Sequence, residues 1–329
     1  MERSPDLVGL FSKNFFVGFL VLILMALAPF FVTTHWVIIL TEIIIMSLFA
    51  MSFNLLFGYT GLLSFGQAGF FGVGAYVSAL TLTHLSSSFW VCLPVGIVGG
   101  MLFALVIGWF CVRLDEIYFA ILTLGFGMML FTLAHNWLSV TGGSDGLTIA
   151  SMPVLSIFGH KIELFNPKFF YWVSLTVVSL GIIFLRQIVK SPFGLLLTAT
   201  RENSQRVSFV GQNVRTVRLV AFTIAGSLAG MAGVLFALFN RIASPEMLHW
   251  SFSGKAVLMT ILGGSSVFLG PAVGTAVFFV LEHFITSYTT NWMIFLGAIL
   301  VILVLAFPQG VLGTLATFFS KLNGGRNSD

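Results

Sequence analysis

The chain has 329 residues, of which 58% are hydrophobic and only 8% are charged, and its net charge is +4. An ordinary soluble domain carries about 25% charged residues, and this composition leaves too little polar surface to cover a soluble globule. It therefore excludes a cytosolic enzyme, a disordered chain and a secreted disulfide scaffold, and it predicts an all-α integral membrane protein.

Apolar segments long enough to be candidates for membrane-spanning helices recur along the whole chain, since a span needs about 20 mostly apolar residues. We expect about ten of them, at residues 15–33, 36–57, 67–84, 89–112, 117–137, 169–187, 219–240, 254–267, 270–287 and 292–307. The first apolar run continues through Val32, which favours a retained span over a cleaved signal peptide. Glycines and Pro271 interrupt 254–287, so two short or broken helices joined by a tight turn are expected there, and the total is eight to ten.

The positions of Lys and Arg predict the orientation of the spans. With ten spans and both termini in the cytoplasm, the outer segments hold Lys161, Lys168, Arg241 and Lys255, and the remaining basic residues lie inside. This bias agrees with the positive-inside rule. Residues 1–329 are thus expected to form a single transmembrane domain.

Two loops in this arrangement are long, an outer one at 138–168 and an inner one at 188–218. In the inner loop, Ser191 followed by Pro192 is typical of a helix start, and Gly211 is typical of a helix end. We therefore expect one or two short amphipathic helices between them. Such helices dock into a groove of a partner protein or lie on lipid headgroups, and the basic residues of the loop fit both alternatives.

Glycine-rich interruptions occur in both halves of the chain, at Gly58–Gly74 and Gly263–Gly274. Such breaks in corresponding positions are typical of transporters built from inverted repeats, although glycine also serves simply for close helix packing. The small residues Gly226, Gly230 and Gly233 follow the spacing of close helix packing, and we interpret them as structural.

The stretch Asn54–Tyr76 contains the polar residues Ser64 and Gln67 among many glycines, which predicts a backbone that leaves the regular helix. Irregular backbone at membrane depth is tolerated where it lines a cavity or is buried in protein. The stretch therefore lines a pathway or an interhelix seam, or it forms a tight loop before a packed helix. Glu42 should face the protein interior, as a pathway residue or hydrogen-bonded to a neighbour such as Asn54.

Polar residues elsewhere in the spans carry weaker signals. Glu282 and His283 are expected to be solvated near the outer end of a span. Cys92 and Cys111 lie in apolar runs and are expected to be small buried hydrophobes. The sequence contains no P-loop, its six histidines have no metal-ligand spacing, and no catalytic constellation is present, so we expect neither an enzyme nor a metal site.

Several of these segments together resemble the permease subunits of branched-chain amino acid ABC importers. The resemblance rests on Asn54–Tyr76, on Ser191–Gly194 with Arg201-Glu202-Asn203 and Gly211, and on Gly263 to Pro271. Residues 141–147 resemble the outer-loop motif of the methionine-type second permease of the high-affinity leucine, isoleucine and valine system. The resemblance runs from about residue 36 to residue 315. Arg206 and Val207 depart from a usual alanine pair, and Gln67 stands where many members have His.

The resemblance implies the ABC importer permease fold in the bacterial cytoplasmic (inner) membrane. Its partners would be a second homologous permease, two ATP-binding cassette ATPases that use the ATP, and a periplasmic or lipid-anchored substrate-binding protein; this chain would bind no cofactor. The ATPase-coupling residues would be Ser191, Pro192, Phe193, Gly194, Arg201, Glu202, Asn203 and Gly211. The translocation-pathway candidates are Glu42, Asn54, Ser64 and Gln67. Leucine, isoleucine and valine are the expected substrates; urea or short amides, or a self-contained secondary transporter, are the alternatives.

Overall fold

The computed structural model describes residues 23–150, 153–157, 160–289, 291–307 and 309–314. Within them, seven helices are long and apolar enough to cross a membrane, so the protein is an all-helical multi-pass membrane protein. These are Thr34–Thr60, Phe89–Cys111, Ile117–Asn136, Pro167–Lys190, Val214–Asn240, Gly270–Tyr288 and Met293–Thr314. Each of the seven coincides with a predicted segment. Of the predicted span 15–33, residues 23–31 are helical and 15–22 lie outside the described residues.

The other two predicted spans form shorter helices, α3 (Gln67–His84) and α11 (Trp250–Gly263). At 1.5 Å per residue, α11 is only about 21 Å long, less than the ~30 Å hydrocarbon core of a bilayer. Gly264, with a φ of 101°, begins the turn between α11 and α12 (Gly270–Tyr288). The prediction of two helices joined by a tight turn in this stretch is confirmed, and α12 begins at Gly270 as expected.

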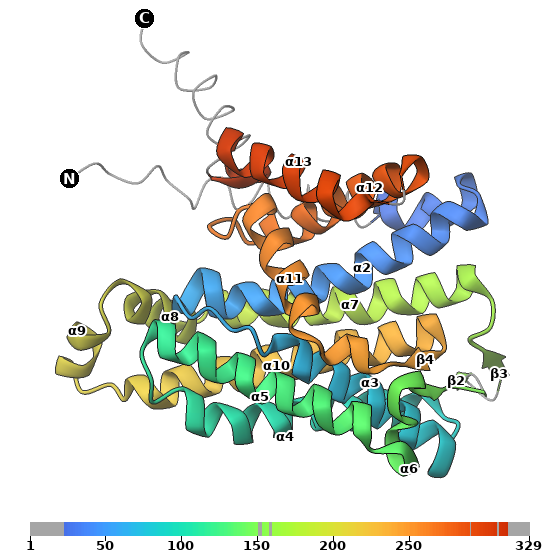
Figure 1. Ribbon diagram of the computed structural model, residues 1–329, viewed down its shortest axis with the longest axis horizontal. Helices are drawn as coiled ribbons and strands as arrows, with labels where there is room; N and C mark the ends of the chain where they lie inside the picture. Colours follow the sequence, from blue (N-terminus) through green and yellow to red (C-terminus); the bar gives the residue numbers. More distant parts are fainter. Residues whose placement is uncertain (1–22, 151–152, 158–159, 290, 308, 315–329) are drawn as a thin grey trace, which may run out of the picture.

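Two long helices lie at the centre of the structure, α2 (Thr34–Asn54) and α10 (Val214–Asn240). Helix α2 packs against α7 (Pro167–Lys190), α11 and α12, whereas α10 packs against α3 and α4 (Phe89–Cys111). The two central helices also contact each other. Helices α5 (Glu116–Asn136) and α13 (Trp292–Ala306) are more peripheral, and Figure 1 shows α11 crossing the direction of most other helices.

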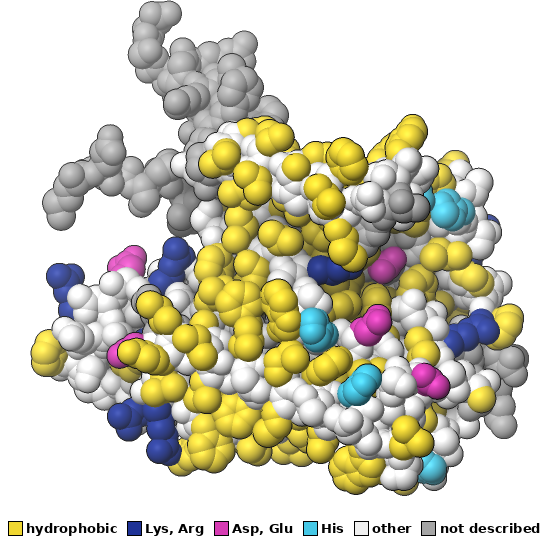
Figure 2. Space-filling view, viewed as in Figure 1, with side chains coloured by type: hydrophobic (Ala, Val, Ile, Leu, Met, Phe, Trp, Pro, Cys, Tyr) yellow, Lys and Arg dark blue, Asp and Glu magenta, His cyan; other side chains and the backbone are white. Residues whose placement is uncertain are grey.

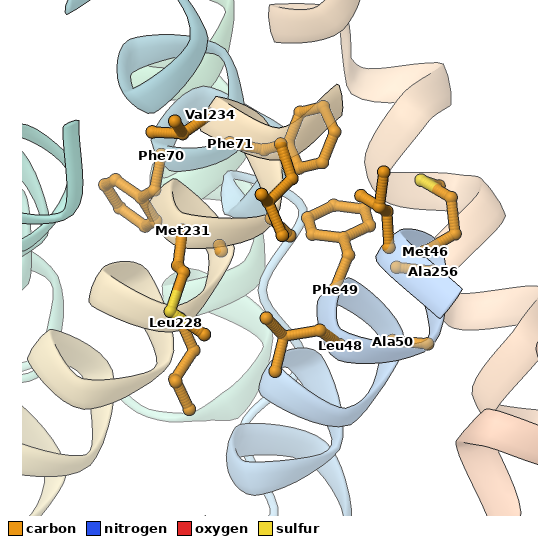
Figure 3. Close-up of a cluster of buried hydrophobic side chains, with 14 of the residues drawn as sticks. Met46, Leu48, Phe49, Ala50, Phe70, Phe71, Leu228, Met231, Val234 and Ala256 are labelled. Atoms are coloured by element: carbon orange, nitrogen blue, oxygen red, sulfur yellow. The ribbon is translucent and has the colours of Figure 1, made fainter. Parts of the chain in front are cut away.

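Aromatic and aliphatic side chains from α2, α3, α10 and α11 fill the space between the central helices (Figure 3). The rings of Phe49 and Phe71, for example, lie 4.8 Å apart. Close helix packing accompanies this cluster, because a Cβ atom added to Gly74 would lie 2.3 Å from the carbonyl oxygen of Gly230. The predicted packing role of Gly226, Gly230 and Gly233 is confirmed, since a Cβ atom on each would lie 2.2, 3.1 and 1.9 Å, respectively, from an atom of a neighbouring helix. Cys92 and Cys111 are buried free thiols, as expected.

Short elements occupy the two ends of the helix bundle (Figure 1). One end carries α8 (Pro192–Glu202) and α9 (Ser204–Phe209). The other carries α6 (Leu138–Thr141), η2 (Gly143–Asp145), β1 (Leu147–Thr148), β2 (Val154–Ile157), β3 (His160–Glu163), β4 (Ile242–Ala243) and η3 (Pro245–Leu248). Strands β2 and β3 form an antiparallel hairpin, and β1 pairs antiparallel with β4. The outer loop is thereby attached to the chain that follows α10.

Candidate functional site

The first candidate region is the break that follows α2. The helix continues as a π-helix, η1 (Leu55–Thr60), and ends at Gly61, whose φ of 77° is left-handed. The chain then runs without regular structure to Gly66, passing between α2 and α5 in Figure 1, and α3 begins at Gln67. Leu62, Ser64 and Gly66 are buried in this stretch, whereas the alternate residues are half-buried. The predicted departure from regular helix is confirmed, and one edge of the unwound chain reaches the surface.

Side-chain amides fix this break to the central helices. Gln67 is fully buried, and its Nε2 donates to Ser52 Oγ at 3.2 Å and to the Ala225 carbonyl at 3.0 Å. The start of α3 is thereby tied to both α2 and α10. Asn54 Nδ2 donates to the Ser265 carbonyl at 3.3 Å, which connects the end of α2 to the turn after α11.

Three polar atoms of this region make no hydrogen bond within the described residues: Asn54 Oδ1, Ser64 Oγ and Gln67 Oε1. Buried polar atoms normally have a partner, so these three mark a region that stands apart from an ordinary helix core. The three side chains are almost fully buried inside this chain. That Ser64 and Gln67 line the substrate route therefore stays a prediction, and within this chain no part of either side chain reaches the surface.

Glu42 does not make the contact with Asn54 that was one of the two alternatives expected for it. It is separated from Asn54 by about 18 Å along the axis of α2, so the two cannot hydrogen-bond. Instead, the half-buried Glu42 lies close enough to Lys255 and Glu282 for electrostatic interaction with both. Lys255 Nζ and Glu282 Oε1 form a salt bridge of 3.2 Å. The expectation that Glu282 is merely solvated is also wrong, since its side chain is only 18% exposed and is paired.

A second break follows α10 and was missed by the sequence analysis. Arg241 adopts a left-handed conformation with a φ of 58°, and β4 and η3 follow before His249 caps α11. A Cβ atom on Gly72 of α3 would lie 2.3 Å from Leu248 Cγ, so this segment packs closely against α3. The available signal was Ser244-Pro245, which cannot continue a helix or a central strand.

The outer-loop motif at residues 141–147 contacts the second break and fixes its position against α5. Thr141 Oγ1 lies 2.6 Å from the Ala134 carbonyl and fixes the motif to the end of α5. Gly142, Gly143 and Gly146 have φ values of 76°, 66° and 73°, a conformation that favours glycine. A Cβ atom on Gly146 would lie only 2.4 Å from the Ala243 carbonyl oxygen, so the glycine is required by the close approach of β4.

The inner loop forms the two helices that were predicted for it. Pro192 is the first residue of α8 and Ser191 its N-cap, but the Ser191 hydroxyl donates to the Ile188 carbonyl at 2.7 Å and does not cap α8. Asn203 is the N-cap of α9 and accepts from the Arg206 backbone N–H at 2.9 Å. Gly211 follows α9 with a left-handed φ of 85°, as expected of a helix end.

Helix α8 is in direct contact with the first break. The Arg201 guanidinium donates to the Gly58 carbonyl oxygen, and a Cβ atom on Gly61 would lie 3.0 Å from Arg201 Cγ. Gly194 allows α8 to approach the end of α7, since a Cβ atom added at this position would lie 2.0 Å from the Val189 carbonyl oxygen. The inner loop is thus connected to the membrane-embedded break through α8.

The outward side of this loop is apolar and grooved. Leu195, Phe209 and Val210 are 73%, 88% and 81% exposed, and Phe193 is half-buried. A groove of about 440 Å³ lies between α8 and α9. It is lined by Leu196, Ala199, Glu202, Asn203, Arg206, Val207, Val210 and Gln212. Exposed apolar patches of this kind mark contact surfaces.

No group of three or more His, Cys, Asp or Glu residues that could hold a metal ion occurs among the described residues. The family model for the permease component of branched-chain amino acid transport systems matches residues 36–304. No solved structure matches the chain significantly.

Curated relatives agree with the family match. The chain is 30% identical to the high-affinity branched-chain amino acid transport system permease protein LivM of Escherichia coli, over 92% of this chain and 75% of the relative. It is 25% identical to the LivH permease protein of the corresponding Salmonella typhimurium system, over 81% of this chain and 91% of the relative. A probable LivM permease of Methanocaldococcus jannaschii is 24% identical, over 75% and 80% respectively.

Proposed function

The chain belongs to the family of permease components of branched-chain amino acid transport systems, and we propose that it is one of two homologous permeases in an ABC importer. The permease itself is not an enzyme. In the proposed assembly, two ATPases bind its inner side and supply the energy. A periplasmic or lipid-anchored binding protein delivers leucine, isoleucine or valine to its outer side. The membrane would be the bacterial inner membrane, with both termini in the cytoplasm.

The contact between Arg201 and the first break is the observation that carries this proposal. Helix α8 lies at the surface with exposed apolar residues, as a docking helix for another protein would. Its Arg201 reaches the carbonyl oxygen of Gly58, inside a helix that has already left the α-helical pattern. Movement of the ATPases would therefore be transmitted through α8 to the unwound chain at 61–66. We propose that this chain borders the translocation pathway.

The packing of the helices supports the proposed inverted repeat. Each central helix, α2 or α10, ends in an irregular segment that leads to a shorter helix, α3 or α11. The partners also correspond, because α10 packs on α3 and α4 as α2 packs on α11 and α12. This correspondence pairs the break at 55–66 with the one at 241–249. The sequence analysis instead paired the glycine segments Gly58–Gly74 and Gly263–Gly274 as corresponding parts of the two halves. The packing therefore favours a different correspondence.

The proposal is tested in proteoliposomes that contain the complete importer, with ATP available to the ATPases and labelled leucine supplied with the binding protein. Arg201→Ala should lower leucine uptake by roughly tenfold, about the effect of losing one charge-assisted hydrogen bond, while ATP hydrolysis continues. Arg215→Ala is the matched control, because Arg215 is exposed in the same loop at the start of α10. Unchanged uptake by Arg201→Ala would contradict the transmission step. Uptake by this chain alone without ATP would contradict the importer.

A further inference from the structure

A group of three charged side chains lies within the membrane-spanning helices, apart from the first break. Lys255 of α11 and Glu282 of α12 form a salt bridge, and Glu42 of α2 interacts electrostatically with both. By the rise of a helix, Glu42 lies about 12 Å from the start of α2 and Glu282 about 9 Å from the end of α12. The start of α2 lies beside the last turns of α12, since the rings of His35 and His283 lie 5.3 Å apart. The charged group therefore lies toward the end of the bundle at which α2 begins, with Glu282 directly before His283.

This charged group borders open space. The side chains of Lys255 and Glu282 are 35% and 18% exposed. On the same helix as Lys255, Trp250 and Leu258 are exposed, and a Cβ atom on Gly254 would meet no atom within 4 Å. Figure 2 shows basic and acidic side chains on one face of the molecule, among many hydrophobic side chains. The exposed fractions of Lys255 and Glu282 make their side chains partly accessible to a solute.

Charges at this depth are costly, and in membrane proteins they usually face the bundle interior or a water-filled cavity and mark substrate or ion routes. Two carboxylates and one ammonium leave this group with one negative charge in excess when all three are ionised. An added ammonium would compensate that charge. A carboxylate on the same solute would pair with Lys255 and would replace Glu282 there. A zwitterion can therefore enter the salt bridge without leaving a buried charge unpaired, which would cost several kcal/mol.

We propose that Lys255, Glu282 and Glu42 form a binding site for the zwitterionic head group of the transported amino acid. The carboxylate of the solute binds Lys255, and its ammonium binds Glu282 and Glu42. Its apolar side chain then lies along the exposed side of α11, where Trp250 and Leu258 provide apolar contacts. This site rests on the proposed function, since it presumes that branched-chain amino acids cross on this face. Urea and neutral amides lack the paired charges that would open the salt bridge.

The test uses the complete importer in proteoliposomes, with the binding protein saturated with labelled leucine. Lys255→Met should lower the leucine uptake rate by roughly tenfold, the effect of losing one charged contact of about 1.4 kcal/mol. Lys168→Met is the matched control, because Lys168 is exposed at the outer end of α7 and carries the same charge. ATP hydrolysis stimulated by the loaded binding protein should stay within about twofold of wild type in both variants, since neither residue lies near α8.

The double variant Lys255→Met with Glu282→Gln distinguishes a loss of substrate binding from misfolding. It removes both members of the salt bridge and leaves no partner charge unpaired, a change that is often neutral for stability. Slow uptake by a correctly assembled double variant supports the site. Wild-type uptake by the double variant, or by Lys255→Met, overturns the site and leaves the importer intact. If the wild-type importer carries no leucine, both the site and the proposed function are overturned.

Discussion

The two breaks in this protein are held by opposite ends of the molecule. The break at 55–66 is fixed from the inner side, where Arg201 of α8 donates to the Gly58 carbonyl. The break at 241–249 is fixed from the outer side, where β4 pairs with β1 and Gly146 approaches Ala243. Two similar interruptions of long central helices are therefore attached to different loops. In the proposed assembly, the first break would therefore respond to the ATPases and the second to the binding protein.

Their internal construction differs as well. The first break is a π-helix followed by unwound chain with buried amides, and several of its polar atoms make no hydrogen bond within the described residues. The second consists of a left-handed residue, a two-residue strand and a 3-10 helix, and its first residues are tied to β1 by backbone pairing. Backbone pairing fixes geometry more firmly than single side-chain contacts do. We therefore expect the first break to be the more mobile of the two.

The largest expected effect is that of Gly58→Val in the first break. A Cβ atom there would lie 2.7 Å from the Ser265 carbonyl oxygen and 2.3 Å from Asn54 Oδ1. Overpacking of this kind should lower the free energy of unfolding by about 3 kcal/mol. The measurement is detergent-induced unfolding of the purified chain. Gly125→Ala is the control, since a Cβ atom on Gly125 of α5 meets nothing within 4 Å and should leave stability unchanged or slightly raised.

In the second break, Gly146→Ala should lower the free energy of unfolding by about 2 kcal/mol, because the change combines left-handed strain with a clash against β4. The same unfolding assay measures it, together with proteolysis of the outer loop. Gly211→Ala separates the two causes, since Gly211 also has a positive φ but a Cβ atom there meets nothing within 4 Å. Equal losses in the two variants would show that the contact with β4 contributes nothing.

Thr141→Val tests the attachment of the outer motif to α5. The substitution keeps the shape of the side chain and removes the hydroxyl that lies 2.6 Å from the Ala134 carbonyl. We expect a loss of about 1 kcal/mol in the free energy of unfolding, the usual value of one hydrogen bond. Faster hydrogen exchange should be confined to the outer loop and the second break. Exchange that rises equally at 61–66 would show that the two breaks are not held independently.

The smallest expected effect is that of Gln67→Leu. The variant loses the hydrogen bonds to Ser52 Oγ and the Ala225 carbonyl, but it also removes the buried Oε1 atom that has no partner among the described residues. The two changes offset each other, so the free energy of unfolding should fall by less than about 1 kcal/mol. Detergent unfolding measures this change, and a loss as large as that of Gly58→Val would show that the first break is a rigid structural element.

Local patterns in the sequence predicted much of this structure. The bounds of α3 and the start of α12 follow from polar residues and glycines at their ends, and Ser191-Pro192 with Gly211 predicted the two inner helices. The salt bridge between Lys255 and Glu282 could not be predicted in this way. Its two residues lie on different helices, and only their packing brings the charges together.

The second break illustrates a different limit. Its polar residues, Arg241 to Glu246, have the composition of an ordinary outer loop, and nothing local shows that Leu248 packs against the middle of α3. For the same reason, the sequence alone did not predict that Arg201 contacts the first break. The contact of Arg201 with Gly58 joins positions that are far apart along the chain.

The modest apolar character of α3 has a consequence for how the chain is inserted into the bilayer during synthesis. Helix α3 does not qualify as a span by length and hydropathy, and most of its residues are buried against neighbouring helices. Its main packing partners include α10, which the ribosome makes much later. The insertion machinery, or a lipid-shielding helix such as α4, must therefore hold α3 until α10 arrives. Truncation before residue 214 should leave α3 poorly inserted and exposed to membrane proteases.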